Sequence, residues 1–113
     1  MTYRAALSVL LLAAGAQGAL AAQGGLSPQQ IHGRQIVTQN CVVCHLNPNG
    51  DGNQYGPPLN KAAANGDPKL MHQVIETGLV KMPGWKYALS NSDIDDVVAY
   101  IMTIPVSAAP ASR

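Results

Sequence analysis

Phenylalanine is absent from this sequence, tryptophan occurs once, and aromatic residues make up 4% of the 113 positions. A chain of this length has room for one domain. Small domains bury a modest share of their surface and often need an additional stabilising element. The scarcity of aromatic residues therefore indicates that something other than aromatic side chains fills the centre of the fold.

An excess of charge of one sign is also missing. Seven Lys and Arg residues stand against six Asp and Glu residues, and the formal net charge is +1. Proteins that bind nucleic acid carry a basic excess, so this function class is excluded. The near-neutral balance also argues against strong long-range steering of a charged partner.

No hydrophobic run reaches the ~20 strongly apolar residues that a membrane-spanning helix needs. Residues 5–14 come closest, but two glycines and a glutamine follow them. Arg4 before this run and Ala-Leu-Ala at residues 19–21 are typical of a secretory signal peptide. We expect residues 1–21 to be removed by cleavage after Ala21, which makes the mature protein periplasmic, with no integral membrane segment. An uncleaved membrane anchor is the alternative.

Three helices are predicted by their N-terminal caps. The first, over residues 27–39, begins with Ser-Pro and has a glutamine that completes a capping box. The second, over residues 67–78, begins with Asp-Pro and ends at a glycine. The third, over residues 90–105, has a Ser/Asp capping box, one apolar stripe and a final proline. Because no segment alternates like a strand, we predict an all-α fold.

Long loops connect these helices. Residues 46–60 contain six glycines and prolines, which exclude a helix or a central strand. One short helical turn is expected at residues 61–64. Residues 105–113 are rich in Ala, Ser and Pro and are expected to form a flexible tail, which leaves residues 22–104 as the domain. Loops of this length need something to wrap around.

The most informative motif is Cys41-Val42-Val43-Cys44-His45. Two cysteines three positions apart and followed at once by histidine are typical of c-type haem attachment. Each thiol adds to one vinyl group of the haem, and the adjacent histidine offers a ring nitrogen to the iron. The motif therefore predicts one covalent haem c, attached through Cys41 and Cys44, with His45 as one axial iron ligand.

Other interpretations of the cysteine pair explain less. A thioredoxin-like redox pair would need a βαβ setting, and no strands are predicted. A zinc site needs four protein ligands, and the chain has no second cysteine pair. A structural disulfide would leave His45 unexplained.

Met82 is the candidate for the second axial ligand, on the opposite face of the haem. Pro83 and Gly84 follow it and break the helical pattern, so Met82 lies on a loop that can turn its sulfur inward. Met82 could instead fill the core, as most methionines do. Four residues fit less well, because the methionines lie within helices and the histidines at solvated or surface positions: Met71, Met102, His72 and His32.

With these residues the sequence resembles the class I c-type cytochromes along nearly the whole mature chain. Gly33 stands eight residues before the first cysteine, Gly56-Pro57-Pro58-Leu59 follows the motif, and Met82-Pro83 matches the distal loop. The resemblance implies the class I cytochrome c fold, with three main helices and long loops wrapped around one haem.

The resemblance also implies roles for individual residues. The carbonyl of Pro57 is expected to accept a hydrogen bond from His45, and Pro57 and Leu59 are assigned to the haem site. Gly33 is expected to let the first and last helices cross closely. Val37 departs from the family, which usually has an aromatic residue there, so a looser contact with Tyr100 is expected.

His/Met ligation raises the reduction potential of haem iron and leaves no coordination site for a substrate. We therefore predict a non-enzymatic carrier that transfers one electron at a time between periplasmic or respiratory redox proteins. Its partners would be a dehydrogenase, an oxidase or a cytochrome complex, and it would act as a monomer or as a subunit. A dedicated cytochrome subunit of a periplasmic dehydrogenase is the second hypothesis. An open-haem enzyme of the peroxidase type, which needs a vacant distal site, is the third.

Three residues near Met82 complete the expected site. Trp85 is predicted to pack close to the haem, with its indole N–H bound to a polar group such as a propionate. Lys81 and Lys86 flank the ligand loop and are predicted to belong to the docking rim around the haem edge. Two ordinary solvated lysines are the alternative.

Overall fold

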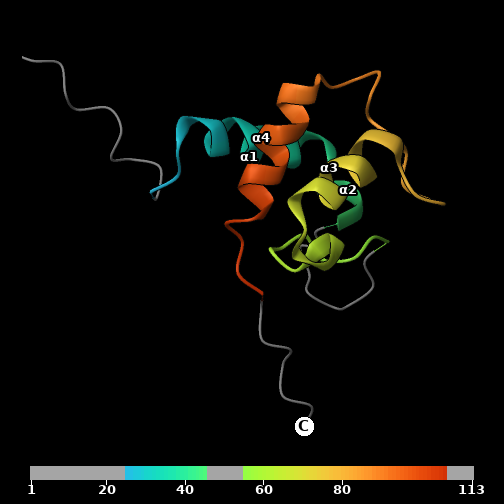
Figure 1. The fold of residues 1–113 in the computed structure, drawn as a ribbon, viewed down its shortest axis with the longest axis horizontal. Coiled ribbons are helices and arrows are strands. Elements are labelled where there is room, and N and C mark those ends of the chain that lie inside the picture. Colours follow the sequence, from blue (N-terminus) through green and yellow to red (C-terminus); the bar gives the residue numbers. More distant parts are fainter. Residues whose placement is uncertain (1–24, 46–54, 107–113) are drawn as a thin grey trace, which may run out of the picture.

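The computed structural model describes residues 25–45 and 55–106, which form helices and turns (Figure 1). Within these two ranges there is no strand, and the one strand-like feature is an isolated bridge between Leu79 and Met82. The all-α prediction is confirmed. Among the described residues, no helix is both long and apolar enough to cross a membrane. The elements in chain order are α1 (Pro28–Asn40), α2 (Val42–His45), the 3₁₀ turn η1 (Ala63–Gly66), α3 (Pro68–Thr77) and α4 (Asn91–Ile101).

The predicted caps begin each long helix. In α1, the Gln30 N–H donates to Ser27 Oγ at 3.2 Å, and the Ser27 N–H donates to Gln30 Oε1 at 2.9 Å. Asp67 accepts the Lys69 N–H at the start of α3. Each side chain satisfies a backbone donor that the first helical turn leaves without a partner.

The cap of α4 carries charge as well as hydrogen bonds. The Asp93 N–H donates to Ser90 Oγ at 3.1 Å, and the Ser90 hydroxyl and N–H donate to the Asp93 carboxylate at 2.7 and 3.0 Å. These hydrogen bonds hold the pKa of Asp93 below its ordinary value. Because the pKa of Asp93 is lower in the folded than in the unfolded state, the ionised carboxylate stabilises the fold, and this contribution is complete at pH values above the unfolded-state pKa. The contribution is lost as the pH falls through the folded-state pKa of Asp93.

Two boundaries differ from the sequence prediction. The short turn occupies residues 63–66 rather than 61–64, and inside it Ala64 and Asn65 adopt φ values of 52° and 58°, which are not helical. Helix α4 ends at Ile101 and not at Pro105. The ring of a proline collides with the carbonyl four residues earlier in a helix, and that carbonyl belongs to Ile101.

Several predictions from the sequence lie outside the described residues. These are the signal peptide over residues 1–21, most of the loop over residues 46–60, and the tail apart from its first two residues.

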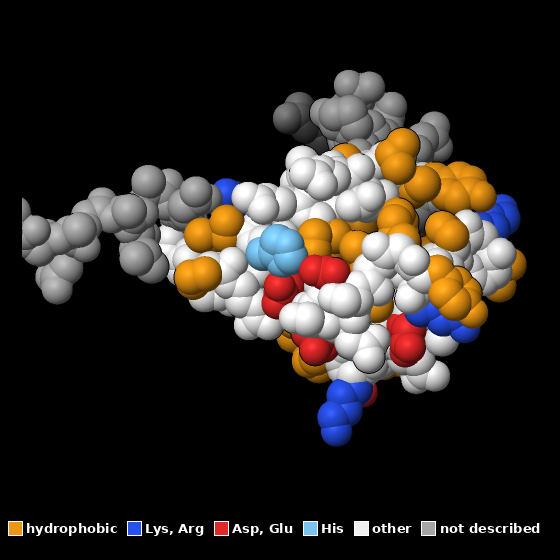
Figure 2. All heavy atoms as spheres, turned by 90° about the horizontal axis from the view of Figure 1, so that it is seen from above, with side chains coloured by type: hydrophobic (Ala, Val, Ile, Leu, Met, Phe, Trp, Pro, Cys, Tyr) orange, Lys and Arg blue, Asp and Glu red, His pale blue; other side chains and the backbone are white. Residues whose placement is uncertain are grey.

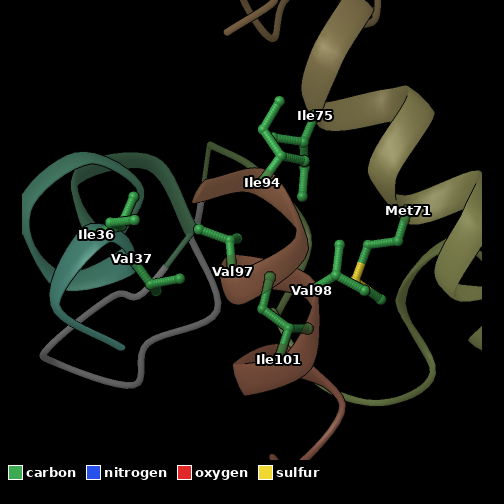
Figure 3. Close-up of a cluster of buried hydrophobic side chains, with 8 residues drawn as sticks. All are labelled: Ile36, Val37, Met71, Ile75, Ile94, Val97, Val98 and Ile101. Atoms are coloured by element: carbon green, nitrogen blue, oxygen red, sulfur yellow. The ribbon is translucent and has the colours of Figure 1, made fainter. Parts of the chain in front are cut away.

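Eight buried apolar side chains from three helices form the hydrophobic core. Figure 3 shows α4 in the middle, with side chains of α1 on one side and of α3 on the other. Val37 is 2% exposed, so neighbouring groups enclose this smaller residue closely. The core residues are Ile36, Val37, Met71, Ile75, Ile94, Val97, Val98 and Ile101.

Helices α1 and α4 cross at Gly33, as expected. A Cβ atom built on Gly33 would overlap the backbone carbonyl of Asp96. The Cβ atom would be fixed to the backbone of α1, and the carbonyl is part of the backbone of α4, so neither can move aside as the end of a flexible side chain would. The glycine therefore permits the approach of α4 on which the core depends.

Gly33→Ala is expected to lower the free energy of unfolding by about 2 kcal/mol or more. Overlap with a backbone group places the overpacking cost at the upper end of its range, about 3 kcal/mol or more, and the better helix propensity of alanine returns roughly 1 kcal/mol. Denaturant unfolding of the haem-loaded protein measures the difference. Gln35→Ala, on an exposed position of the same helix, is the control and should be nearly neutral. Equal stability of the two variants would contradict the tight crossing.

Candidate haem site

The cysteine–histidine motif begins where α1 ends. Cys41 caps α1, and its N–H donates to the Val37 carbonyl at 2.9 Å. The N–H groups of Cys44 and His45 then donate to the Cys41 carbonyl at 3.2 and 3.0 Å, which folds the motif into the single turn α2. Both cysteines are half-buried free thiols. Burial raises the pKa of Cys41, and the nearby Cys44 raises it further, so Cys41 is a protonated thiol at neutral pH.

The imidazole of His45 is held by the loop that precedes η1. His45 is 9% exposed, and its Nδ1 lies 2.7 Å from the Pro57 carbonyl oxygen. A carbonyl only accepts, so Nδ1 carries the hydrogen and Nε2 of the neutral ring keeps its lone pair. A neutral imidazole whose other nitrogen is fixed in this way is a ready iron ligand.

Gly56 packs against the same ring. A Cβ atom there would lie 2.6 Å from Cε1 and 2.7 Å from Nδ1 of His45. The Gly56 N–H also donates to the Cys44 carbonyl at 2.7 Å. Gly56 and Pro57 therefore both contact the cysteine–histidine motif and hold it against the loop that precedes η1.

Met82 lies on a tight turn after α3. The Leu79 N–H donates to the Met82 carbonyl at 3.1 Å, and the Met82 N–H donates back to the Leu79 carbonyl. Only Val80 and Lys81 connect the two residues. Met82 is half-buried against the hydrophobic core, and so are three other predicted site residues: Cys41, Leu59 and Trp85. These four residues, which are far apart in the sequence, all pack against the same core.

Trp85 is half-buried, and within residues 25–45 and 55–106 its indole N–H has no hydrogen-bond partner. An indole N–H near an apolar core usually finds an acceptor.

Three of the four other possible axial ligands, Met71, His32 and His72, have contacts elsewhere, and Met102 packs against the core. Met71 is buried in the core. Nδ1 of His32 donates to Asp96 at 2.7 Å, and Nδ1 of His72 donates to Asp95 at 2.8 Å. His72, which was expected at a solvated position, pairs on the surface with Asp95 because α3 packs on α4 and brings the two residues together. In the face that Figure 2 shows, a histidine lies directly against acidic side chains.

The surface around Met82 combines apolar and positive groups. Lys81 Nζ lies 5.9 Å from the ring centre of Tyr55, and Lys86 Nζ lies 4.9 Å from that of Tyr87. Both tyrosines are exposed, and Val80 at the tip of the turn is fully exposed. Neither tyrosine was predicted from the sequence to lie at this site, although Tyr87 adjoins Lys86 and Tyr55 adjoins Gly56.

The residues present fit a haem c. Two free thiols and an imidazole with an available Nε2 lie within one helical turn, beside an apolar core. A zinc site fits poorly, because the described residues contain no cluster of three or more His, Cys, Asp or Glu side chains able to hold a metal ion. The donor set thus suits a haem, which Cys41 and Cys44 would hold covalently and whose iron His45 would bind.

Comparison with known proteins agrees with this donor set. Residues 28–101 match the family model described as cytochrome c oxidase, cbb3-type, subunit III. Cytochrome c6 of Synechocystis is 35% identical over 83 residues, which span 68% of this chain and 67% of that protein. The cytochrome c subunit of the quinone-type alcohol dehydrogenase of Gluconobacter oxydans is 31% identical over 82 residues, which span 61% of this chain but 17% of that subunit.

Solved structures with the same fold include two cytochromes c6. That of the diatom Phaeodactylum tricornutum gives a TM-score of 0.53 at 26% identity, covering 66% of this chain and 91% of the diatom protein. Cytochrome c6C of Synechococcus gives 0.52 at 29% identity, covering 64% and 92%. The chain therefore belongs to the class I c-type cytochromes, carries haem c, and transfers electrons.

Proposed function

We propose that this cytochrome is a single-haem carrier in which Cys41 and Cys44 form the thioether bonds and His45 and Met82 are the axial ligands. When bound, the haem iron supplies a one-electron redox couple. The hydrogen bond from His45 Nδ1 to the Pro57 carbonyl is the observation that carries this proposal. It fixes the ring orientation and the tautomer, which leaves Nε2 available to bind iron.

Met82 supplies the second half of the proposal. A thioether is a soft ligand that favours ferrous iron, so Met82 raises the reduction potential. It also fills the distal position, which excludes peroxide and other small ligands. Trp85, Leu59 and Pro57 line the same site in this proposal, with the Trp85 N–H available to a propionate.

The test uses the purified haem-loaded protein. A redox titration should follow a one-electron curve, the oxidised form should show the weak near-infrared band of iron–sulfur ligation, and the reduced form should resist carbon monoxide. Rapid carbon monoxide binding by the unmodified protein would favour the open-haem enzyme and would remove Met82 from the ligand set.

Export to the periplasm is part of the same proposal. The pattern of residues 1–21 supports removal after Ala21, which would leave residues 22–104 as the cytochrome domain and residues 105–113 as a flexible tail. N-terminal sequencing of the protein from its native host tests this. An intact Met1 on the mature protein would support the membrane-anchor alternative.

A dedicated subunit of a periplasmic dehydrogenase is the second candidate. It is favoured by the similarity to the Gluconobacter subunit, of which this chain spans 17%. Co-purification from the native host separates the two candidates, because a subunit stays with its dehydrogenase and a free carrier elutes alone.

The docking rim is proposed to include Lys81 and Lys86, each of which lies over an exposed tyrosine ring. Reversing both charges to glutamate is expected to slow electron exchange with the native partner about tenfold at low salt, and less at high salt. Stopped-flow reduction measures the rate, and reversal of Lys69, on α3, is the matched control. Equal rates for all variants would make Lys81 and Lys86 ordinary solvated lysines.

A further inference from the structure

The turn that carries Met82 begins and ends at a glycine. Gly78 caps α3, donates its N–H to the Val74 carbonyl at 2.8 Å, and has φ 80° and ψ 173°. Residues with a side chain are essentially excluded from this backbone region. The chain can therefore leave α3 in this direction only at a glycine.

Gly78 also packs against the backbone of the Met82 turn, and Gly84 packs against the backbone at the end of α3. A Cβ atom on Gly78 would lie 2.5 Å from the Met82 carbonyl oxygen and 2.6 Å from the Gly84 nitrogen. A Cβ atom on Gly84 would lie 2.7 Å from the Thr77 carbonyl oxygen and 2.8 Å from that of Glu76. The turn thus lies directly on the last turn of α3, with no side chain between them.

Hydrogen bonds close the same interface. The Trp85 N–H donates to the Ile75 carbonyl at 3.0 Å, and the Lys86 N–H donates to the Glu76 carbonyl at 3.2 Å. These carbonyls lie in the last turn of α3, where the helix supplies no partner of its own. They are therefore satisfied by the segment that follows Met82.

We propose that Gly78 and Gly84 are positioning residues that hold Met82 at the haem iron. The methionine side chain has three rotatable bonds, and a thioether is a weak ligand, so a mobile backbone would let Met82 leave the iron. The contact between the glycines fixes the Met82 backbone to α3, and α3 is fixed to the core through Met71 and Ile75. This inference rests on Met82 being the distal ligand.

The experiment compares three glycine-to-alanine variants of the haem-loaded protein. Gly78→Ala introduces both backbone strain and overlap with the turn. Gly84→Ala introduces overlap alone, because Gly84 has no positive φ. Gly66→Ala is the matched control, since Gly66 has φ 71° but its Cβ would come no closer than 3.4 Å to another residue.

Gly78→Ala and Gly84→Ala are expected to lose most of the near-infrared iron–sulfur band, to bind carbon monoxide, and to shift to a lower reduction potential. Strain of this kind shifts the balance between attached and detached Met82 by roughly tenfold or more. Covalent haem content and helical circular dichroism should stay at the level of Gly66→Ala, which keeps the band.

Each result decides something. Retention of the band in both Gly78→Ala and Gly84→Ala would overturn the positioning role while leaving Met82 as the ligand. Global loss of helix in both variants would also overturn it, because the glycines would then serve the stability of the whole domain. Absence of the band from the unmodified protein would remove Met82 itself, which is failure of the proposed function and not of this inference.

Discussion

Replacing both Cys41 and Cys44 by alanine is expected to release the haem into the organic layer when the protein is extracted with acid and acetone. In the unmodified protein the haem should remain with the polypeptide, because two thioether bonds survive acid that breaks the bond between His45 and iron. The difference is nearly all-or-none, and absorbance of the two layers measures it directly.

The same replacement is expected to lower the thermal stability by a large margin. Cys41, Leu59, Met82 and Trp85 are half-buried around the core, and a covalently held haem would cover their remaining apolar surface at about 25 cal/mol per Å². Val43→Ala is the control, since Val43 stands between the cysteines and is exposed. Haem in the organic layer of the unmodified protein would contradict covalent attachment.

Met82→Ala is expected to abolish the near-infrared band of the oxidised protein and to open the iron to carbon monoxide. Alanine offers no donor atom, so the distal position would pass to water or stay open. The reduction potential should fall, because the thioether no longer favours the ferrous state. Optical spectra and a redox titration of the variant report all three changes.

Met71→Leu is the control for Met82→Ala. Met71 is 3% exposed in the core, and exchange of methionine for leucine keeps the volume at a cost of less than about 1.5 kcal/mol. This variant should keep the band. Loss of the band in Met71→Leu alone, or its persistence in Met82→Ala, would assign the distal side to another residue.

Local chemistry explains why the helix starts could be predicted. Ser27, Asp67 and Ser90 each accept a backbone N–H within three residues, so the information lies in a short stretch of sequence. The hydrogen bond between His45 and Pro57 spans 12 positions, and it was implied only by the family resemblance.

The features that were missed depend on contacts between elements. His72 pairs with Asp95 across 23 positions, and neither residue carries a local sign of the other. The support of Met82 by Gly78 and Gly84 was also missed. A glycine after a helix predicts a stop, but the backbone that it packs against is known only once the turn has folded back.

The crossing of α1 and α4 has a consequence for how the chain folds. His32 and Asp96 meet across 64 positions, so this one crossing encloses the haem motif, the Met82 turn and α3 in a single closed loop. Closing a flexible loop of that length costs about 4 kcal/mol of chain entropy. The helices can form early from local contacts, and α3 can pack on α4 across 23 positions, but the packing of α1 on α4 must wait for this closure. Changes at the crossing should therefore alter the folding rate more than changes of similar energy at the Met82 turn, which closes within a few residues.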